Sequence, residues 1–402
     1  MKVSKLNAKF LEAIPVLQKI IDAGYEAYFV GGSVRDSLLN REITDIDIAS
    51  SALPEEIKLI FPKTFDVGIE HGTVVVLHNN QTYEITTFRT ESTYKNFRRP
   101  ETVNFVRSLQ EDLKRRDFTM NAMALTMDGT IVDYFNGQAH LKEKMIQTVG
   151  NAKDRFQEDA LRMLRAVRFA SQLGFFIEEN TMEAIRDRGH LLEHISVERK
   201  LTEFNKLLDG PYINQGINYL VNTSIYTYLP QLQQFKDSLM KLAELSLNDL
   251  TLVEKWTILL YVARLSEEET ARFLTAWKQP TKVIKQIKQL LKWLNFRETL
   301  VWDSYHLYTA QLHTVISVEK IRSVLSMAIV DIDSLNEMYD QLPIKSRDEI
   351  VVSGKDIIAW AQRRQGPWVR EIIEAMECAI INKQLLNQKS EIEVWVHQCL
   401  LK

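Results

Sequence analysis

The sequence reads Tyr28-Phe-Val-Gly-Gly-Ser-Val-Arg-Asp36, and nine residues later it continues with Asp45-Ile-Asp47. The apolar run at 27–30 predicts a buried strand, the two glycines a tight turn, and residues 34–39 the first turns of a helix. Glycine lets the backbone approach an anion closely, and the start of a helix offers unpaired N–H groups. The turn therefore suits a triphosphate. No Gly-Lys-Ser/Thr follows it, which disfavours a Walker-type NTPase.

Two carboxylates follow the turn on the next expected strand. Residues Thr44 to Ile48 alternate polar and apolar, so Asp45 and Asp47 should share one strand face, opposite Ile46. Parallel carboxylates repel each other, and Mg²⁺ bound with a nucleotide phosphate relieves that repulsion. The pattern predicts a metal site at these two residues. The alternative is a solvated strand face beside an ordinary turn, and only the two features together favour nucleotide chemistry.

Composition describes ordinary globular material. The chain has 402 residues, 45% hydrophobic and 26% charged, enough for about two to four domains. No apolar run approaches the roughly 18–20 residues that span a bilayer, and no signal peptide is evident, so we expect a cytoplasmic protein without membrane contact. Cys378 and Cys399 have no Cys-x-x-Cys spacing, which indicates neither zinc nor a disulfide framework. The net charge of −3 argues only weakly against nucleic acid, because local basic patches decide binding.

The remaining strand signals end near residue 138. A helix at 5–23 precedes the first strand, and strands at 73–77 and 82–88 flank Asn79-Asn80 as a hairpin. Alternation leaves Glu84 two orientations of equal weight, as a third carboxylate at the metal site or as an exposed strand residue. Residues 89–107 lack a sustained period, and such a long loop is more often functional or mobile than structural.

Helical patterns fill the rest of the chain. One long helix is expected at 151–173, ended by Gly174, and it carries Asp159, Arg162, Arg165 and Arg168. Further helices are expected at 178–190, 196–209, 213–228, 231–245, 250–263, 267–276 and 280–295 and beyond.

The helix at 280–295 has two faces. Lysines form a stripe opposite an apolar face of Val283, Ile284, Ile287, Leu291 and Leu294. The stripe consists of Lys282, Lys285, Lys288 and Lys292. It is first of all a solvated helix face, and contact with RNA phosphates is the alternative.

The motifs resemble a known family in order and spacing. They are Gly31-Gly-Ser-Val-Arg-Asp36, Asp45-Ile-Asp47, Arg115-Arg-Asp-Phe-Thr-Met-Asn-Ala-Met123, Asp133 to Gly137, and Glu158-Asp-Ala-Leu-Arg-Met-Leu-Arg-Ala-Val-Arg168. The chain is similar to bacterial class II tRNA nucleotidyltransferases and looks like a CCA-adding enzyme of the Firmicutes type. Asn96 departs from the family pattern, which has Asp before Arg-Arg-Pro.

The resemblance implies an α+β protein with a polymerase β-like nucleotidyltransferase head, built on a mixed sheet, and all-helical neck, body and tail domains. It implies a catalytic head at 1–137, a neck for nucleotide selection at 138–209, and a body and tail that bind tRNA at 210–295 and 296–402. Asp45 and Asp47 would bind Mg²⁺, and Glu84 would join them as catalytic residues. The ATP- and CTP-binding residues would be Gly32, Arg35, Arg116, Asp159, Arg162, Arg165 and Arg168. Relatives form homodimers, and their counterpart of the 89–107 loop is needed for the final A.

The expected reaction is template-independent addition of C, C and A to the 3′ end of tRNA. The tRNA 3′-hydroxyl must attack the nucleotide α-phosphate, with pyrophosphate leaving, and no nucleophilic Ser, Cys or His is required. Three alternatives stay open at this point. They are an enzyme that adds only CC or only A, a poly(A) polymerase of the same superfamily, and an inactive scaffold that would have no need of both Asp45 and Asp47.

Overall fold

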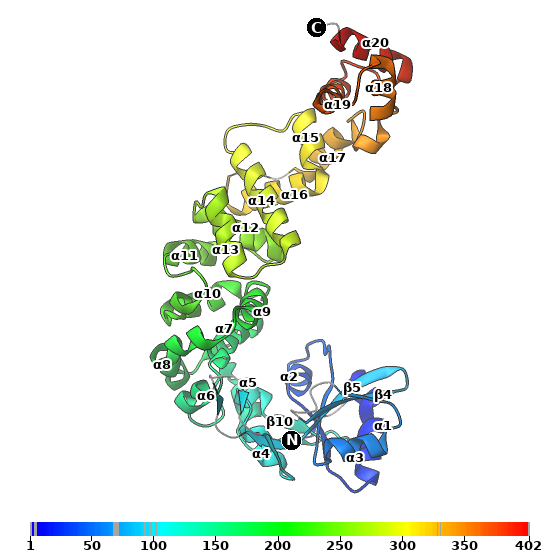
Figure 1. Ribbon diagram of the computed structural model, residues 1–402. Coiled ribbons are helices and arrows are strands. Elements are labelled where there is room, and N and C mark those ends of the chain that lie inside the picture. Colours follow the sequence, from blue (N-terminus) through cyan, green and yellow to red (C-terminus); the bar gives the residue numbers. More distant parts are fainter. Residues whose placement is uncertain are drawn as a thin grey trace. The chain divides into compact units, whose positions relative to one another are not determined.

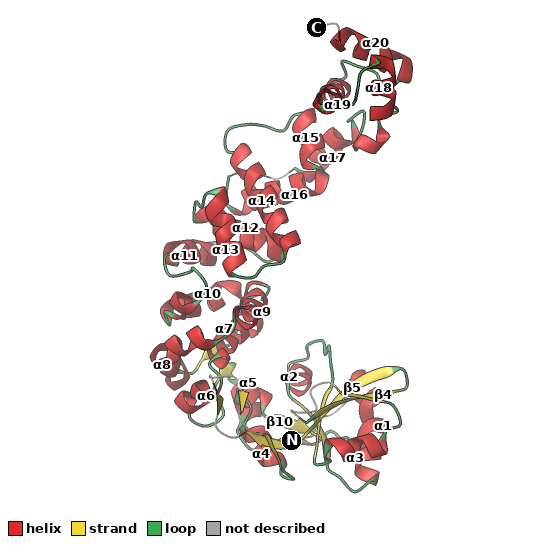
Figure 2. Ribbon diagram, viewed as in Figure 1, coloured by secondary structure: helices red, strands yellow, loops and turns green. Residues whose placement is uncertain are grey.

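The computed structural model describes residues 2–3, 6–66, 72–91, 94–95, 99–100, 103–327, 329 and 331–400. The chain folds as two compact units. The first contains Met1–Glu244 and Thr275–Lys278, and the second contains Leu245–Leu274 and Gln279–Lys402. The first unit combines a mixed sheet with helices, and the described part of the second is helical (Figures 1 and 2). The expected fold class is therefore confirmed. The four-domain division stays a prediction.

A mixed sheet forms the centre of the head. Within the described residues its strands are β1 (Ala27–Val30), β2 (Asp47–Ser50), β3 (Thr64–Asp66), β4 (Thr73–His78), β5 (Gln81–Thr87), β10 (Met123–Leu125) and β11 (Ile131–Asp133). They lie in the order β11-β10-β1-β2-β5-β4-β3. Among the described strands of this sheet, β2 and β5 are the only parallel neighbours, and this pairing places Asp47 directly beside Glu84.

The predicted hairpin is confirmed. Strands β4 and β5 pair up to His78 and Gln81, and the two residues between them have φ angles of 49° at Asn79 and 61° at Asn80. Two consecutive positive φ angles match the right-handed twist of the flanking strands, and Asn tolerates this region better than most residues. The hairpin fixes the register of β5 against β4, in which Glu84 lies opposite Val75.

Some helices of the first unit pack on the sheet, and the others follow the sheet in the sequence. They are α1 (Ala8–Asp22), α2 (Gly32–Leu38), α3 (Pro54–Ile60), α4 (Leu109–Lys114), α5 (Gly137–Lys142), α6 (Ala152–Glu158), α7 (Leu161–Leu173), α8 (Glu179–Arg188), α9 (Val197–Leu208), α10 (Ile213–Asn222) and α11 (Lys236–Glu244). Helix α1 packs on β1, with the rings of Phe10 and Phe29 centred 4.7 Å apart. Fully buried apolar side chains of this kind hold the sheet in place.

The second unit contains the later helices. They are α12 (Leu252–Val262), α13 (Glu267–Ala276), α14 (Thr281–Phe296), α15 (Ser304–Ala310), α16 (Leu312–Val324), α17 (Ile332–Asp340), α18 (Gly354–Ala361), α19 (Pro367–Ile381) and α20 (Lys389–Leu400), with α13 ending in the first unit. None of the described helices is both long and apolar enough to cross a membrane. The helix expected at 280–295 is confirmed as α14.

Three sequence expectations were wrong in detail. Strand β2 begins at Asp47, so Asp45 precedes the strand. The expected loop at 89–107 contains paired strands, β6 (Arg89–Glu91) with β9 (Val103–Phe105) and β7 (Tyr94–Lys95) with β8 (Arg99–Pro100). Backbone pairing satisfies polar groups there without a periodic sequence. Asn96 lies outside the described residues.

The third error concerns the helix expected at 151–173. It is interrupted at Asp159, whose φ of −136° and ψ of 102° are extended. The physical reason is a side-chain hydrogen bond, because the Leu161 N–H donates to Oδ1 of Asp159 at 3.0 Å. The Asp159 side chain thus bonds to the backbone two residues ahead where α6 ends, and α7 begins after its N-cap residue, Ala160.

Candidate active site

The glycine turn brings the backbone close to charged side chains. Gly31 has a φ of 73° and a ψ of −136°, a conformation open to glycine and strained for other residues. A Cβ there would lie 3.1 Å from Nη1 of Arg116 and 3.4 Å from Oδ2 of Asp47. At Gly32 it would make only ordinary contact, 3.6 Å from Nη2 of Arg35. The turn therefore requires glycine at position 31.

We expect Gly31→Ala to impair nucleotide binding much more than Gly32→Ala. The alanine methyl would displace Arg116 and Asp47, and the backbone conformation alone should cost about 1–3 kcal/mol. Thermal melting and KM for CTP measure the two effects. Gly150→Ala is the matched control for backbone strain, because Gly150 also has a φ of 73° but a Cβ there would meet nothing within 4 Å, and equal KM values for CTP in Gly31→Ala and Gly150→Ala would contradict the argument.

Three carboxylates line one cavity of about 700 Å³ in the head, which we call the carboxylate cavity. Asp45, Asp47 and Glu84 lie in its wall, together with Gly32 and Arg35. Asp47 and Glu84 are neighbours on parallel strands, so their side chains leave the sheet on the same face. Of the two orientations that the sequence left open for Glu84, the structure has the one beside the aspartates.

The electrostatics of Asp47 reflect this crowding. Partial desolvation raises the pKa of Asp47, Arg116 lowers it, and Glu84 and Asp45 raise it further, so that the net shift is upward. The side chain remains accessible to solvent at the start of β2, so the shift marks a recessed group and not a buried one. The raised pKa means that the ionised form of Asp47 is disfavoured here, and a bound cation would favour it.

The carboxylates fit a divalent cation that is shared with substrate. Among the described residues, no three acidic, histidine or cysteine side chains converge as a complete ligand set. Mg²⁺ does not need one, because it keeps several waters and is held by one or two carboxylates plus substrate phosphates. The hard oxygen donors of Asp45 and Asp47 suit that mode of binding.

Two arginines lie beside the glycine turn, and different residues hold their side chains. Arg116 pairs with Asp112 at 3.3 Å, and its Nε is buried without a hydrogen-bond partner in the described part of the chain. Arg35 is held by Asp36 at 2.8 Å and donates through Nη1 to the Asn121 side chain at 2.7 Å. Nη1 of Arg116 lies beside the glycine turn, where a guanidinium can donate to a phosphate oxygen.

The structure assigns Asp159 and Arg162 separate partners. Their backbones meet in a turn closed by the Arg162 N–H and the Asp159 carbonyl at 3.0 Å. Asp159 forms an ion pair with Arg199 at 2.8 Å, while Arg162 pairs with Glu158 at 2.7 Å and donates to the Arg115 carbonyl at 2.8 Å. The last contact joins Arg162 to the residue before Arg116. The expectation that both side chains project from one helix is wrong, because the backbone at Asp159 is extended and lies between α6 and α7.

The other two arginines of the Glu158 to Arg168 motif are held by acidic residues that were not among the predicted site residues. Arg165 donates to Asp117 at 2.7 Å, and Arg168 forms an ion pair with Glu203 at 2.9 Å. Burial alone would raise the pKa of Asp117, but Arg165 and the Asn121 amide, which donates at 3.0 Å, hold it well below its usual range. Burial lowers the pKa of Arg168 to about 10 against the raising effect of Glu203. Buried pairs like these fix orientation.

These contacts connect the helix after the glycine turn with α7, both within the first unit. Arg35 and Arg165 meet through Asn121 and Asp117, so the helix after the glycine turn is linked to α7 by hydrogen bonds. Asp117 and Asn121 belong to the Arg115 to Met123 motif, and this motif is the sequence feature that could have indicated them as site residues. Glu203 had none, because a single Glu on an amphipathic helix is ordinary.

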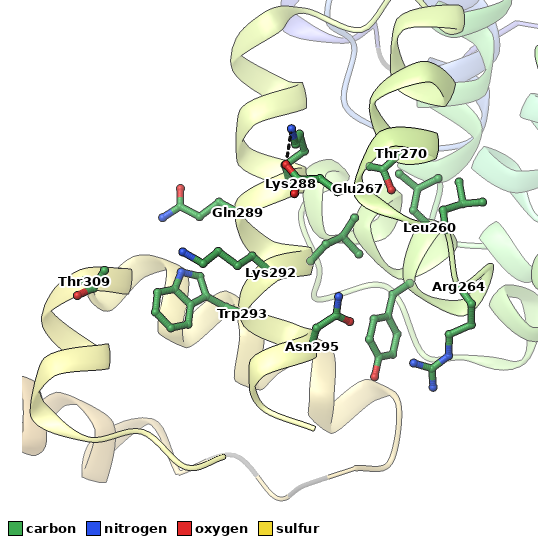
Figure 3. A pocket seen from close by; sticks show the side chains of 13 residues that line it. Leu260, Arg264, Glu267, Thr270, Lys288, Gln289, Lys292, Trp293, Asn295 and Thr309 are labelled. Atoms are coloured by element: carbon green, nitrogen blue, oxygen red, sulfur yellow. Dashed lines mark ion pairs between the residues drawn. The ribbon is translucent and has the colours of Figure 1, made fainter. Parts of the chain in front are cut away.

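A second cavity, of about 680 Å³, lies in the second unit between α12, α13 and α14. Figure 3 shows Lys288 paired with Glu267, at 2.7 Å, and Lys292 on the next turn of α14. Lys282, Lys285 and Lys292 are exposed. Of the four lysines in the stripe, Lys288 is therefore paired and the other three are exposed.

Three family models match the chain. "Poly A polymerase head domain" matches residues 27–147, "Probable RNA and SrmB- binding site of polymerase A" matches residues 174–236, and tRNA nucleotidyltransferase domain 2 matches residues 251–396. The first covers the glycine turn and the carboxylates.

Relatives match along the whole length. The chain is 46% identical over 396 residues to the CCA-adding enzyme of Bacillus cytotoxicus, covering 98% of this chain and 99% of the relative. The same figures hold for the CCA-adding enzyme of Bacillus cereus strain AH820. The crystal structure of the Bacillus stearothermophilus CCA-adding enzyme in complex with CTP superposes with a TM-score of 0.90 at 42% identity, covering 98% of each chain.

Proposed function

The chain belongs to the CCA-adding enzymes, the tRNA nucleotidyltransferases that extend the 3′ end of tRNA with C, C and A, and we propose the following roles for its residues. The observation that supports these roles best is the carboxylate cavity, where Asp45, Asp47 and Glu84 lie beside the glycine turn. Catalysis would take place there, with the triphosphate lying against the turn and Arg116.

Asp45 and Asp47 would hold Mg²⁺. A divalent ion bound there would lower the pKa of the attacking 3′-hydroxyl and neutralise charge on the phosphates. Glu84, adjacent to Asp47 on the neighbouring strand, would act with the two aspartates as the third catalytic carboxylate of the cavity. Gly32, Arg35 and Arg116 would contact the triphosphate, with Nη1 of Arg116, beside the glycine turn, as a donor to it. Asp159 and Arg162 would bind the base edge, with Arg165 and Arg168 completing the nucleotide pocket. No covalent intermediate with the protein is needed.

The product sequence distinguishes the remaining alternatives. Purified protein is incubated with tRNA lacking CCA, with CTP and ATP separately and together, and the 3′ ends are sequenced. We expect C, C and A with both nucleotides. Products ending in CC or lacking C would indicate a CC-adding or A-adding enzyme, and addition of A to an arbitrary RNA would indicate a poly(A) polymerase.

We propose that the exposed lysines of α14 contact tRNA phosphates. The double variant Lys282→Ala/Lys285→Ala should weaken tRNA binding. It should also reduce the slope of log affinity against log salt by about one to two, because for each phosphate contact that is lost, about one counterion fewer is released on binding. Filter binding at several salt concentrations measures this. Lys19→Ala with Lys63→Ala, two exposed lysines of the head, is the control of equal charge. An unchanged slope would leave the stripe a solvated face.

We further propose that the enzyme works in the cytoplasm, where its partners tRNA, CTP and ATP are found, and that it forms the homodimer implied by the family resemblance. Light scattering during size exclusion would measure the mass, and a single-chain mass of 46.7 kDa would contradict the dimer.

A further inference from the structure

Helix α9 supplies a side chain to the base-reading carboxylate. Arg199 lies near the start of α9, 40 residues after Asp159, and donates through Nη2 to Oδ2 at 2.8 Å and through Nη1 to Oδ1 at 3.4 Å. The two side chains are 26% and 18% exposed, so the contact is largely sheltered from solvent. We propose that Arg199 is a positioning residue that sets the plane of the Asp159 carboxylate and thereby the choice of C and A over U and G.

This inference rests on the proposed role of Asp159 as a reader of the base edge. A carboxylate offers about four acceptor positions. Oδ1 of Asp159 accepts from the Leu161 N–H at 3.0 Å and from Arg199, and Oδ2 accepts from Arg199. About one position then remains, on Oδ2. That is the capacity needed for one exocyclic amine of cytosine or adenine.

The two-point contact matters because Asp159 lies outside regular helix. Its extended backbone leaves the side chain at the junction of α6 and α7, and the hydrogen bond from the Leu161 N–H holds only Oδ1. The planar guanidinium fork of Arg199 restricts rotation about the last side-chain bond, which a point charge does less well. A carboxylate free to rotate could turn away from a carbonyl of uracil or guanine and so lose its power to reject them.

The partner of Arg162 is independent of this contact. Arg162 is held by Glu158 and by the carbonyls of Arg115 and Arg155. Loss of Arg199 should therefore disturb one of the two base contacts and leave the other in place. Selectivity should fall without being abolished.

The experiment compares the ratio of kcat/KM for CTP to that for UTP on tRNA lacking CCA. Arg199→Met should lower this ratio about tenfold, mainly through KM for CTP, because one of two discriminating contacts is loosened. Arg199→Lys should recover part of it, since an ammonium supplies one hydrogen bond but no fork. Lys206→Met, an exposed cation on the same helix, should match wild type. Melting temperature and tRNA affinity verify folding, and Arg199→Lys carries the test if Arg199→Met does not fold.

The outcomes separate this inference from the proposed function. Wild-type failure to add C and A, or unchanged selectivity in Asp159→Ala, would refute the reader and the inference with it. Altered selectivity in Asp159→Ala with unaltered selectivity in both Arg199 variants would overturn the inference alone. Tighter CTP binding in Arg199→Met at constant selectivity would also overturn it, because Arg199 would then be a competitor of the base.

Discussion

Asp47→Asn is expected to lower nucleotide addition by on the order of 10³-fold or more while tRNA binding survives. The change keeps the shape of the side chain but removes the charge that would hold Mg²⁺ beside Glu84 and Asp45. Cation stabilisation of phosphoryl-transfer charge amounts to several kcal/mol, and each 1.36 kcal/mol is about tenfold in rate. Single-turnover incorporation of C with saturating CTP measures the loss.

The direction of the pKa shift at Asp47 gives an independent check that the variant folds. Because its pKa is raised in the folded protein, ionisation there costs folding free energy, and this cost is complete once the pH exceeds the raised pKa. Asparagine removes the cost. The metal-free variant should therefore melt at the same temperature as wild type or slightly higher near pH 8. Added Mg²⁺ and CTP should stabilise wild type and not the variant.

A matched control comes from the same sheet. Asp66 on edge strand β3 is exposed and pairs with Lys58, so Asp66→Asn makes the same chemical change away from the carboxylate cavity. It should leave incorporation near the wild-type rate. Near wild-type turnover in Asp47→Asn would show that catalysis does not depend on this carboxylate.

The parts of the head that the sequence could predict are those set by local chemistry. The strand and helix around Gly31 follow from apolar runs and turn residues, and the Asn79-Asn80 hairpin follows from a backbone conformation that few residues adopt. The pairing of Asp47 with Glu84 depends on β2 and β5 being parallel neighbours. Nothing local decides that, so the sequence left the orientation of Glu84 open.

Residues 151–173 and α9 show which features local sequence patterns do not predict. The periodicity of 151–173 predicts one helix, but a single hydrogen bond from Leu161 to Asp159 divides it. The partners of the arginines also come from distant segments. Glu203 and Arg199 lie on α9, and Asp117 is 48 residues from Arg165. The sequence shows charges of both signs there, but only the fold decides which of them meet.

Asp159→Ala is expected to reduce selectivity against UTP and GTP more than it reduces turnover with CTP. Cytosine and adenine each present an amine donor beside a ring-nitrogen acceptor, whereas uracil and guanine present a carbonyl acceptor beside an N–H donor. A carboxylate accepts from the amine and a guanidinium donates to the ring nitrogen of cytosine or adenine. With uracil or guanine, the carboxylate faces the carbonyl acceptor and the guanidinium faces the N–H donor, so neither hydrogen bond forms. The turn between Asp159 and Arg162, closed at 3.0 Å, keeps the two residues close enough to serve one base edge.

Each unpaired contact should cost about 1–3 kcal/mol, so removing Asp159 should lower the preference for CTP over UTP by roughly 10–100-fold. Competition assays with mixed nucleotides, followed by sequencing of the 3′ end, measure the preference directly. Asp154→Ala, an exposed carboxylate on α6, provides the control. Arg199 would lose its partner in Asp159→Ala, so circular dichroism and melting must show an intact fold. If selectivity is then unchanged, the Asp159–Arg199 pair is structural, because a carboxylate that read the base could not be removed without admitting U and G.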